Sequence, residues 1–70
     1  MVNTDKLMGA VFARGLNKSK FAQKLGRNGS WLSERLRKRN FTIGDADAIV
    51  AALNLSKAEA TDIFFSQFVA

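Results

Sequence analysis

Apolar residues recur along this chain at intervals of three and four positions, which is the spacing of one face of an α-helix. Leu7 and Val11 form such a pair near the N-terminus, and Leu32 and Leu36 form another near the middle of the chain. Alternation of apolar and polar residues, which is typical of strands, does not persist beyond a few positions. The pattern therefore predicts an all-α fold with five helices, over residues 4–14, 18–25, 29–38, 43–53 and 57–68.

Each of these helices is preceded by a side chain that can accept a hydrogen bond from the first helical turn. Ser56 also has Glu59 three residues later, which is the spacing of a capping box. Gly15 and Gly26 follow the first two helices, where a left-handed residue commonly ends a helix. The short connections predict that residues 1–70 form one compact five-helix domain. The expected caps are Asn3 or Thr4, Asn17, Asn28 or Ser30, Thr42 and Ser56.

The composition argues against several classes of function. The 70 residues contain neither Cys nor His, so we expect no disulfide and no zinc site with the usual ligands. The same absence removes the commonest general base and the strongest nucleophile of enzymes. We therefore expect no enzymatic activity, no small-molecule substrate and no cofactor.

No segment has the length of a membrane span. The longest apolar run covers residues 48–53, whereas a transmembrane helix needs about 20 apolar residues. The first six residues, MVNTDK, lack the apolar stretch of a signal peptide. A peptide lying on a membrane surface is also disfavoured, because Gly26 and Gly29 interrupt the basic stretch, which has no broad apolar face. These features predict a cytoplasmic protein.

Positive charge is concentrated in the middle third of the chain. Residues 17–39 hold eight Lys and Arg residues and a single carboxylate, Glu34, for a net charge of +7. Residues 1–16 carry a net charge of +1 and residues 40–70 a net charge of −3, which brings the whole chain to +5. This distribution indicates either a face that binds a polyanion, most commonly nucleic acid, or a solvated basic face.

The basic segment also has the layout of a helix-turn-helix. Its first expected helix carries Phe21 and Leu25 on one face, with the small residue Ala22 beside them, and ends at Gly26. A second helix begins two or three residues later and is anchored by Leu32. Two helices joined by a short turn containing Gly form the motif whose second helix enters the major groove of DNA.

The apolar and capping positions around this motif are Leu16, Phe21, Ala22, Leu25, Gly26, Leu32, Ser33, Leu36, Phe41, Thr42, Ile49, Leu53, Asn54 and Leu55. Through them, residues 16–55 resemble the helix-turn-helix domains of the lambda-repressor and Cro family of bacteriophages and bacteria. The opening residues NTDKL and the later run Ile63-Phe64-Phe65 are similar to those of short phage-encoded proteins of this type. The resemblance implies a lambda-repressor-like fold and a regulator that binds operator DNA in a bacterial host, often as a dimer, in a switch between lysis and lysogeny.

The resemblance also implies roles for individual residues. The first two turns of the second helix would contact bases, and Lys18 and Arg37 would hold the DNA backbone. Two positions depart from the family pattern, because Gly29 offers no side chain to a base and Arg27 stands where an apolar residue is usual. The expected base contacts are Asn28, Gly29, Ser30, Ser33 and Glu34. With the charge pattern added, the expected phosphate contacts are Lys18, Lys20, Arg27, Arg35, Arg37, Lys38 and Arg39.

Several of these residues have a second interpretation. Glu34 either accepts a hydrogen bond from a cytosine amino group or pairs with Lys38 or Arg37 along its own helix, and the spacing favours the pair. The serines contact bases or phosphates, or form ordinary solvated surface. Trp31 either packs partly against the neighbouring helix, which we favour, or meets a sugar or a thymine methyl group.

The last expected helix carries three large rings on more than one face. A regular helix spreads Phe64, Phe65 and Phe68 over more than one face, so we expect part of this apolar surface to stay exposed in so small a domain, and exposed apolar surface marks interfaces. We therefore expect a protein interface there, for a homodimer or another protein. The alternative is that all three rings cover the core.

Two functions follow from these patterns. The first is a small transcriptional regulator of the Cro or repressor kind that binds operator DNA through the helix over residues 29–38. The second is an anti-repressor or co-repressor that acts by binding a phage repressor and has weak DNA binding of its own, which the missing side chain at Gly29 favours. Operator binding by the protein alone separates the two.

Overall fold

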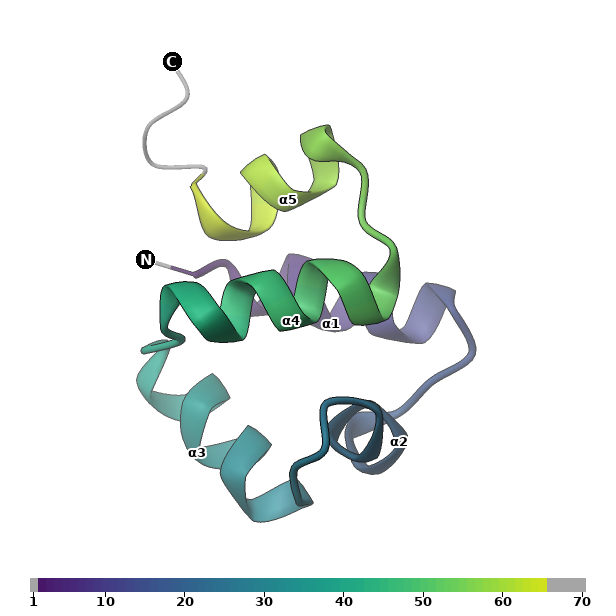
Figure 1. Cartoon of the computed structure of the whole chain (residues 1–70), viewed down its shortest axis with the longest axis vertical. Coiled ribbons are helices and arrows are strands. Elements are labelled where there is room, and N and C mark those ends of the chain that lie inside the picture. The colour runs from purple at the N-terminus through teal and green to yellow at the C-terminus, as the bar shows by residue number, and fades with distance from the viewer. Residues whose placement is uncertain (1, 66–70) are drawn as a thin grey trace.

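The structure, a computed structural model, describes residues 2–65 and is all-helical over that range (Figure 1). The chain measures 34 × 23 × 19 Å. Its helices are α1 (Thr4–Ala13), α2 (Lys18–Lys24), α3 (Gly29–Lys38), α4 (Ile43–Leu53) and α5 (Lys57–Phe64).

The expected all-α fold is confirmed, and α1 to α4 lie within one residue of their predicted bounds. The last helix differs, because α5 ends at Phe64 and the prediction continued it to residue 68. Its carbonyl at Ile63 accepts a hydrogen bond from the backbone N–H of Asn3, at 2.7 Å, so the N-terminal segment satisfies a group left over at the helix end. Phe65 has left the helical conformation, with φ −132°, and residues 66–68 of the prediction lie outside the described residues.

Local side chains begin every helix. The oxygens of Asn3, Asn17 and Asn28 accept hydrogen bonds from backbone N–H groups three residues later, which settles the two caps that the sequence left open. Ser56 and Glu59 form the expected capping box. A second box at Thr42, in which Asp45 returns the hydrogen bond, was not expected.

The core takes side chains from all five helices. Within residues 2–65, every buried side chain is apolar. The largest fully buried ones are Phe21, Leu7, Leu32, Ile49, Leu53 and Val11. Each helix therefore buries one stripe and leaves its remaining faces to solvent, as the amphipathic pattern of the sequence predicts.

The helices pack in two neighbouring pairs around α4. Contacts join α1 to α5 and α2 to α3. Figure 1 shows α4 in front of α1, with α5 on one side of α4 and both α2 and α3 on the other. Residues 25–28 join α2 to α3, and Gly26 turns the chain there with φ +72°, a conformation that side chains disfavour. None of the helices in the described part of the chain is long and apolar enough to cross a membrane.

Arg14 connects three helices from the end of α1. Its guanidinium donates through Nε to the carbonyl of Leu53 at the end of α4, and through Nη1 to the carbonyl of Ala10, at 3.0 Å. Its Nη2 lies 3.3 Å from a carboxylate oxygen of Glu59 in α5. Both carbonyls belong to helix ends, where the backbone has no helical donor. One side chain thus holds α1, α4 and α5 together at their shared edge.

Candidate nucleic-acid interface

The first part of the basic surface is the exposed side of α2. Phe21 and Ala22 are buried and hold α2 in the domain. Lys18, Lys20 and Lys24 are exposed. Lys18 and Lys24 lie one helical turn before and after Phe21, and Lys20 lies on the far side of the helix, so the three ammonium groups surround the buried stripe and do not share one face.

The turn and the first residues of α3 form the second part. The side-chain oxygen of Asn28 accepts a hydrogen bond from the N–H of Trp31, at 2.8 Å, so this atom is engaged in capping. Gly29 has open space where a side chain would begin. Ser30 and Ser33 are exposed. The predicted base-contacting positions thus lie on the surface, and two of them have little to offer a base.

Two guanidinium groups flank the ring of Trp31. The Arg27 guanidinium lies 5.0 Å from the ring centroid and the Arg35 guanidinium 5.7 Å from it. The ring of Phe41 meets the same indole edge to face, with centroids 6.3 Å apart. Trp31 is half-buried against the core, which confirms the predicted partial packing. Its ring therefore brings together two predicted phosphate contacts that are eight residues apart.

Glu34 is paired with two cations on its own helix. Its carboxylate lies 2.8 Å from the guanidinium of Arg37 and 2.9 Å from the ammonium of Lys38. Hydrogen bonds from Lys38, and then from Arg37, hold the pKa of Glu34 below its usual range. The expected pairing along the helix is confirmed, and the carboxylate oxygen that contacts both cations is engaged within the protein.

The end of α3 carries the remaining predicted phosphate contacts. Arg35 donates to the backbone carbonyl of Asn40, at 3.3 Å, and closes the turn after the helix. Arg39 ends the helix in the left-handed conformation, with φ 55°. Arg37, Lys38 and Arg39 are exposed. The basic segment thus covers the outer faces of α2, the turn and α3.

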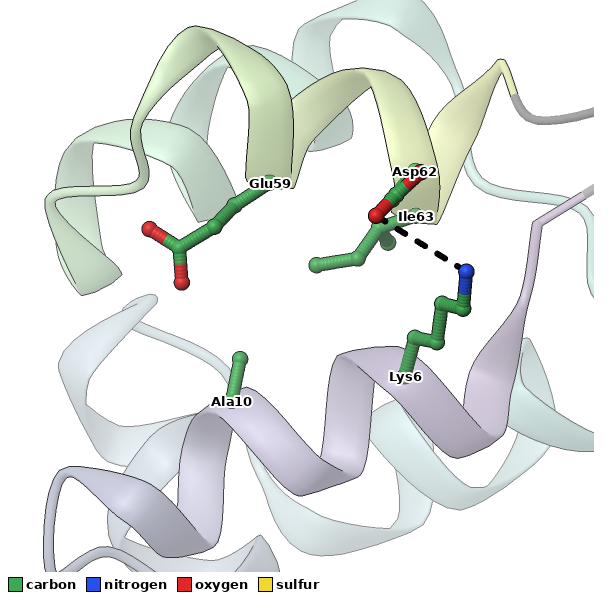
Figure 2. A pocket seen from close by; sticks show the side chains of 5 residues that line it. All are labelled: Lys6, Ala10, Glu59, Asp62 and Ile63. Atoms are coloured by element: carbon green, nitrogen blue, oxygen red, sulfur yellow. Dashed lines mark ion pairs between the residues drawn. The ribbon is translucent and has the colours of Figure 1, made fainter. Parts of the chain in front are cut away.

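Outside this segment, the acidic side chains of Asp62 and Glu59 contact groups of the protein itself. Figure 2 shows Lys6 of α1 and Asp62 of α5 pointing toward each other across a groove of about 230 Å³, with their charged atoms 3.8 Å apart. Glu59 lines the same groove and caps α5. The backbone N–H of Ser56, and then Arg14, lower the pKa of Glu59. The groove between α1 and α5 is therefore lined by groups that already have partners.

The predicted aromatic interface is only partly exposed. Phe64 is buried in the core at 7% exposure, which corrects the expectation of a surface ring, because α5 turns this position toward the interior. Phe65 is 51% exposed and Phe68 lies outside the described residues. Ile43, which the sequence did not single out, is 83% exposed and lines a groove of about 170 Å³ with Phe65.

Two further residues belong to the basic surface and are not among the site residues predicted from the sequence. Lys24 is exposed on α2, and its charge was the signal that it belongs with the phosphate contacts. For Trp31 the sequence predicts partial packing, or a contact with a sugar or a thymine methyl group, and the contact with the arginines was not predicted, although the spacing of four residues to Arg27 and to Arg35 is visible in the sequence. Within residues 2–65, no group of three or more acidic, His or Cys side chains is placed to hold a metal ion.

Comparison with family models, with curated proteins and with solved structures finds no match to this chain. Its function is therefore argued from the side chains of α2 and α3. What these side chains offer is an exposed cationic surface, few groups for base contacts, and one aromatic ring held between two arginines.

Proposed function

We propose that this protein is a small helix-turn-helix regulator of the Cro or repressor kind, which binds double-stranded DNA with α2 and α3 as the motif. In this proposal α3 enters the major groove by its N-terminal end, as the second helix of such motifs does. The observation that carries the proposal is the net charge of +7 on residues 17–39, displayed by two packed helices that a four-residue turn connects.

The distribution of charge on this surface suits the phosphate backbone of DNA better than it suits a small anion. Its cations are spread over both helices and the turn, so they match a row of phosphates. Outside this segment Arg14 and Lys6 are paired with carboxylates of α5. The protein would therefore approach a polyanion with α2 and α3 in front.

Bases would be contacted sparingly. Ser30 and Ser33 bring exposed hydroxyls that can donate to or accept from base edges. Asn28 uses its oxygen as a helix cap, and Gly29 brings no side chain. This inventory supports a protein whose affinity comes mainly from phosphates and whose specificity is modest unless two copies act together. Two copies on one site would place their α3 helices about 34 Å apart, one turn of DNA.

Titration of labelled duplexes across a series of salt concentrations tests the proposal. We expect a linear fall of the logarithm of the binding constant with the logarithm of salt, with a slope near −5 if about six phosphates are neutralised. The double variant Lys18→Ala and Lys20→Ala should reduce the magnitude of that slope by about 2. The control Lys57→Ala removes an exposed cation at the start of α5 and should leave the slope unchanged.

Binding that is absent, or that ignores salt, refutes the proposal. Sequence preference is measured separately, by selecting from a pool of random duplexes and by testing the promoter region of the protein's own gene. Selected sites with two half-sites one turn apart would support a dimer.

A second function is supported by a different surface. Ile43 and Phe65 expose apolar side chains beside a groove that Val2 and Phe41 also line. This surface suits a protein that masks a phage repressor, because apolar residues concentrate at the centres of protein interfaces. Co-purification with a repressor encoded nearby, lost in the variant Ile43→Ser, together with no operator binding by the protein alone, would favour this function over the first.

A further inference from the structure

Trp31 lies within the basic surface, between α2 and the end of α3 in sequence, and its ring is close to the guanidinium groups of Arg27 and Arg35. Two hollows of the surface share it. One, of about 280 Å³, is lined by Arg27, Trp31 and Asp45 among others, and the other, of about 230 Å³, by Trp31, Arg35 and Glu34 among others. The indole is therefore a wall between two concave regions, each with its own arginine.

Both guanidinium groups lie within the range of about 6 Å in which a cation is attracted to an aromatic face. One of the two arginines and the ring itself have further contacts. Arg35 donates to the carbonyl of Asn40. The Trp31 ring itself is held by the edge-to-face contact with Phe41. An arginine on a surface usually samples many rotamers, so these contacts restrict two side chains that a free helix would leave mobile.

We infer that Trp31 is a positioning residue for DNA binding, which holds the guanidinium groups of Arg27 and Arg35 at a fixed separation so that they bind phosphates of the DNA backbone as a pair. The inference rests on the proposed function. The ring makes no phosphate contact itself. It lowers the entropy that the two arginine side chains lose when DNA binds.

Positioning and charge leave different signatures in a salt titration. Trp31→Leu keeps an apolar side chain against the core and both arginines, so the number of neutralised phosphates stays the same. We expect about tenfold weaker binding to a duplex of about 20 base pairs, with an unchanged salt slope. Arg27→Ala and Arg35→Ala should each reduce the magnitude of the slope by about 1. Trp31→Phe retains an aromatic face and should restore most of the affinity.

The contact between the arginines and the ring has a readout of its own without DNA. Trp31 is the chain's single Trp, and the chain has no Tyr, so its fluorescence reports this site alone. Arg27→Ala and Arg35→Ala should each change the emission of the free protein, whereas Lys57→Ala should not. Circular dichroism and thermal unfolding of every variant establish that binding is compared between folded proteins.

The outcomes separate the inference from the proposed function. If the wild-type protein binds duplex DNA and Trp31→Leu binds equally well, the positioning role is wrong while DNA binding stands. A reduced salt slope in folded Trp31→Leu would likewise overturn it, because the ring would then affect the number of contacts. If the wild-type protein shows no salt-dependent binding to DNA, the proposed function fails, and the inference fails with it.

Discussion

Removal of the Arg14 guanidinium is the sharpest test of how these helices are held together. The variant Arg14→Met keeps an unbranched apolar stem of similar length and deletes every donor. It leaves the carbonyls of Leu53 and Ala10 without the hydrogen bonds that Arg14 supplies. Met and Arg have similar helix propensities, so the change acts on these contacts and little on α1 itself.

The magnitude follows from the two carbonyl contacts. A hydrogen bond from a charged donor contributes about 1.5–3 kcal/mol when buried, and less near solvent. The Arg14 side chain is 29% exposed, so we expect a combined loss of about 2 kcal/mol for both. For a domain of this size, about 2 kcal/mol lowers the melting temperature by roughly 8–16 °C.

Thermal unfolding followed by circular dichroism measures the effect. The matched control is Lys6→Met, which removes another cation of α1 that pairs with α5. Its partner Asp62 is 3.8 Å away and both side chains are more than half exposed, so the loss should stay below about 0.5 kcal/mol. Arg14→Lys should fall between the two, because one ammonium cannot reach acceptors on three helices. A melting temperature for Arg14→Met no lower than that of the control would refute the reasoning.

Three further predictions concern charge, acid stability and the turn. Glu34→Gln removes the only carboxylate of the basic segment and releases its two cations, so duplex DNA should bind about 3- to 10-fold more tightly at moderate salt, as measured by fluorescence anisotropy. The pKa values of Glu34 and Glu59 are lowered from 4.5 in the folded protein. Their contribution to stability is therefore present above about pH 4.5 and is lost as the pH falls through the folded values. Glu59→Gln should flatten the decline of melting temperature from neutral pH down to about pH 3. Gly26→Ala should destabilise the domain by about 1–2 kcal/mol, because φ at this position is +72°. Gly29 lies in open space at the start of α3, so Gly29→Ala should leave the melting temperature equal or slightly higher. Equal losses of stability in the two variants would contradict this account.

Helix boundaries were predictable from the sequence because they depend on neighbouring residues. Asn17, Thr42 and Ser56 each bond to a backbone group three positions away, so the signal lies within one helical turn. The pairing of Glu34 was predictable for the same reason. The capping box at Thr42 is also visible in the sequence, as a spacing of three residues to Asp45.

Long-range contacts were not predictable in this way. The hydrogen bond from the backbone N–H of Asn3 to the carbonyl of Ile63 lies at the end of α5, and it joins positions 60 residues apart. The burial of Phe64 and the exposure of Phe65 depend on how α5 packs on the rest of the chain, and the sequence alone does not distinguish the two neighbouring rings. From the sequence, Arg14 is predicted only to contribute one positive charge. The fold shows that its guanidinium has three acceptors, on Leu53, Ala10 and Glu59.

Which face could bind DNA depends on which charged side chains are already paired with an opposite charge in the fold. Outside residues 17–39 the chain carries a net charge of −2, and Lys6 and Arg14 there lie against carboxylates. Within that segment Glu34 cancels one of eight cations, and the contacts of Arg27 and Arg35 with Trp31 leave their charge unneutralised. The basic residues of the segment thus stay together on α2, the turn and α3, although Asp45 of α4 lines the same hollow as Arg27. If the protein binds DNA as proposed, its net charge of +7 on this segment and −2 on the rest would orient it with α2 and α3 toward the DNA before any base is contacted.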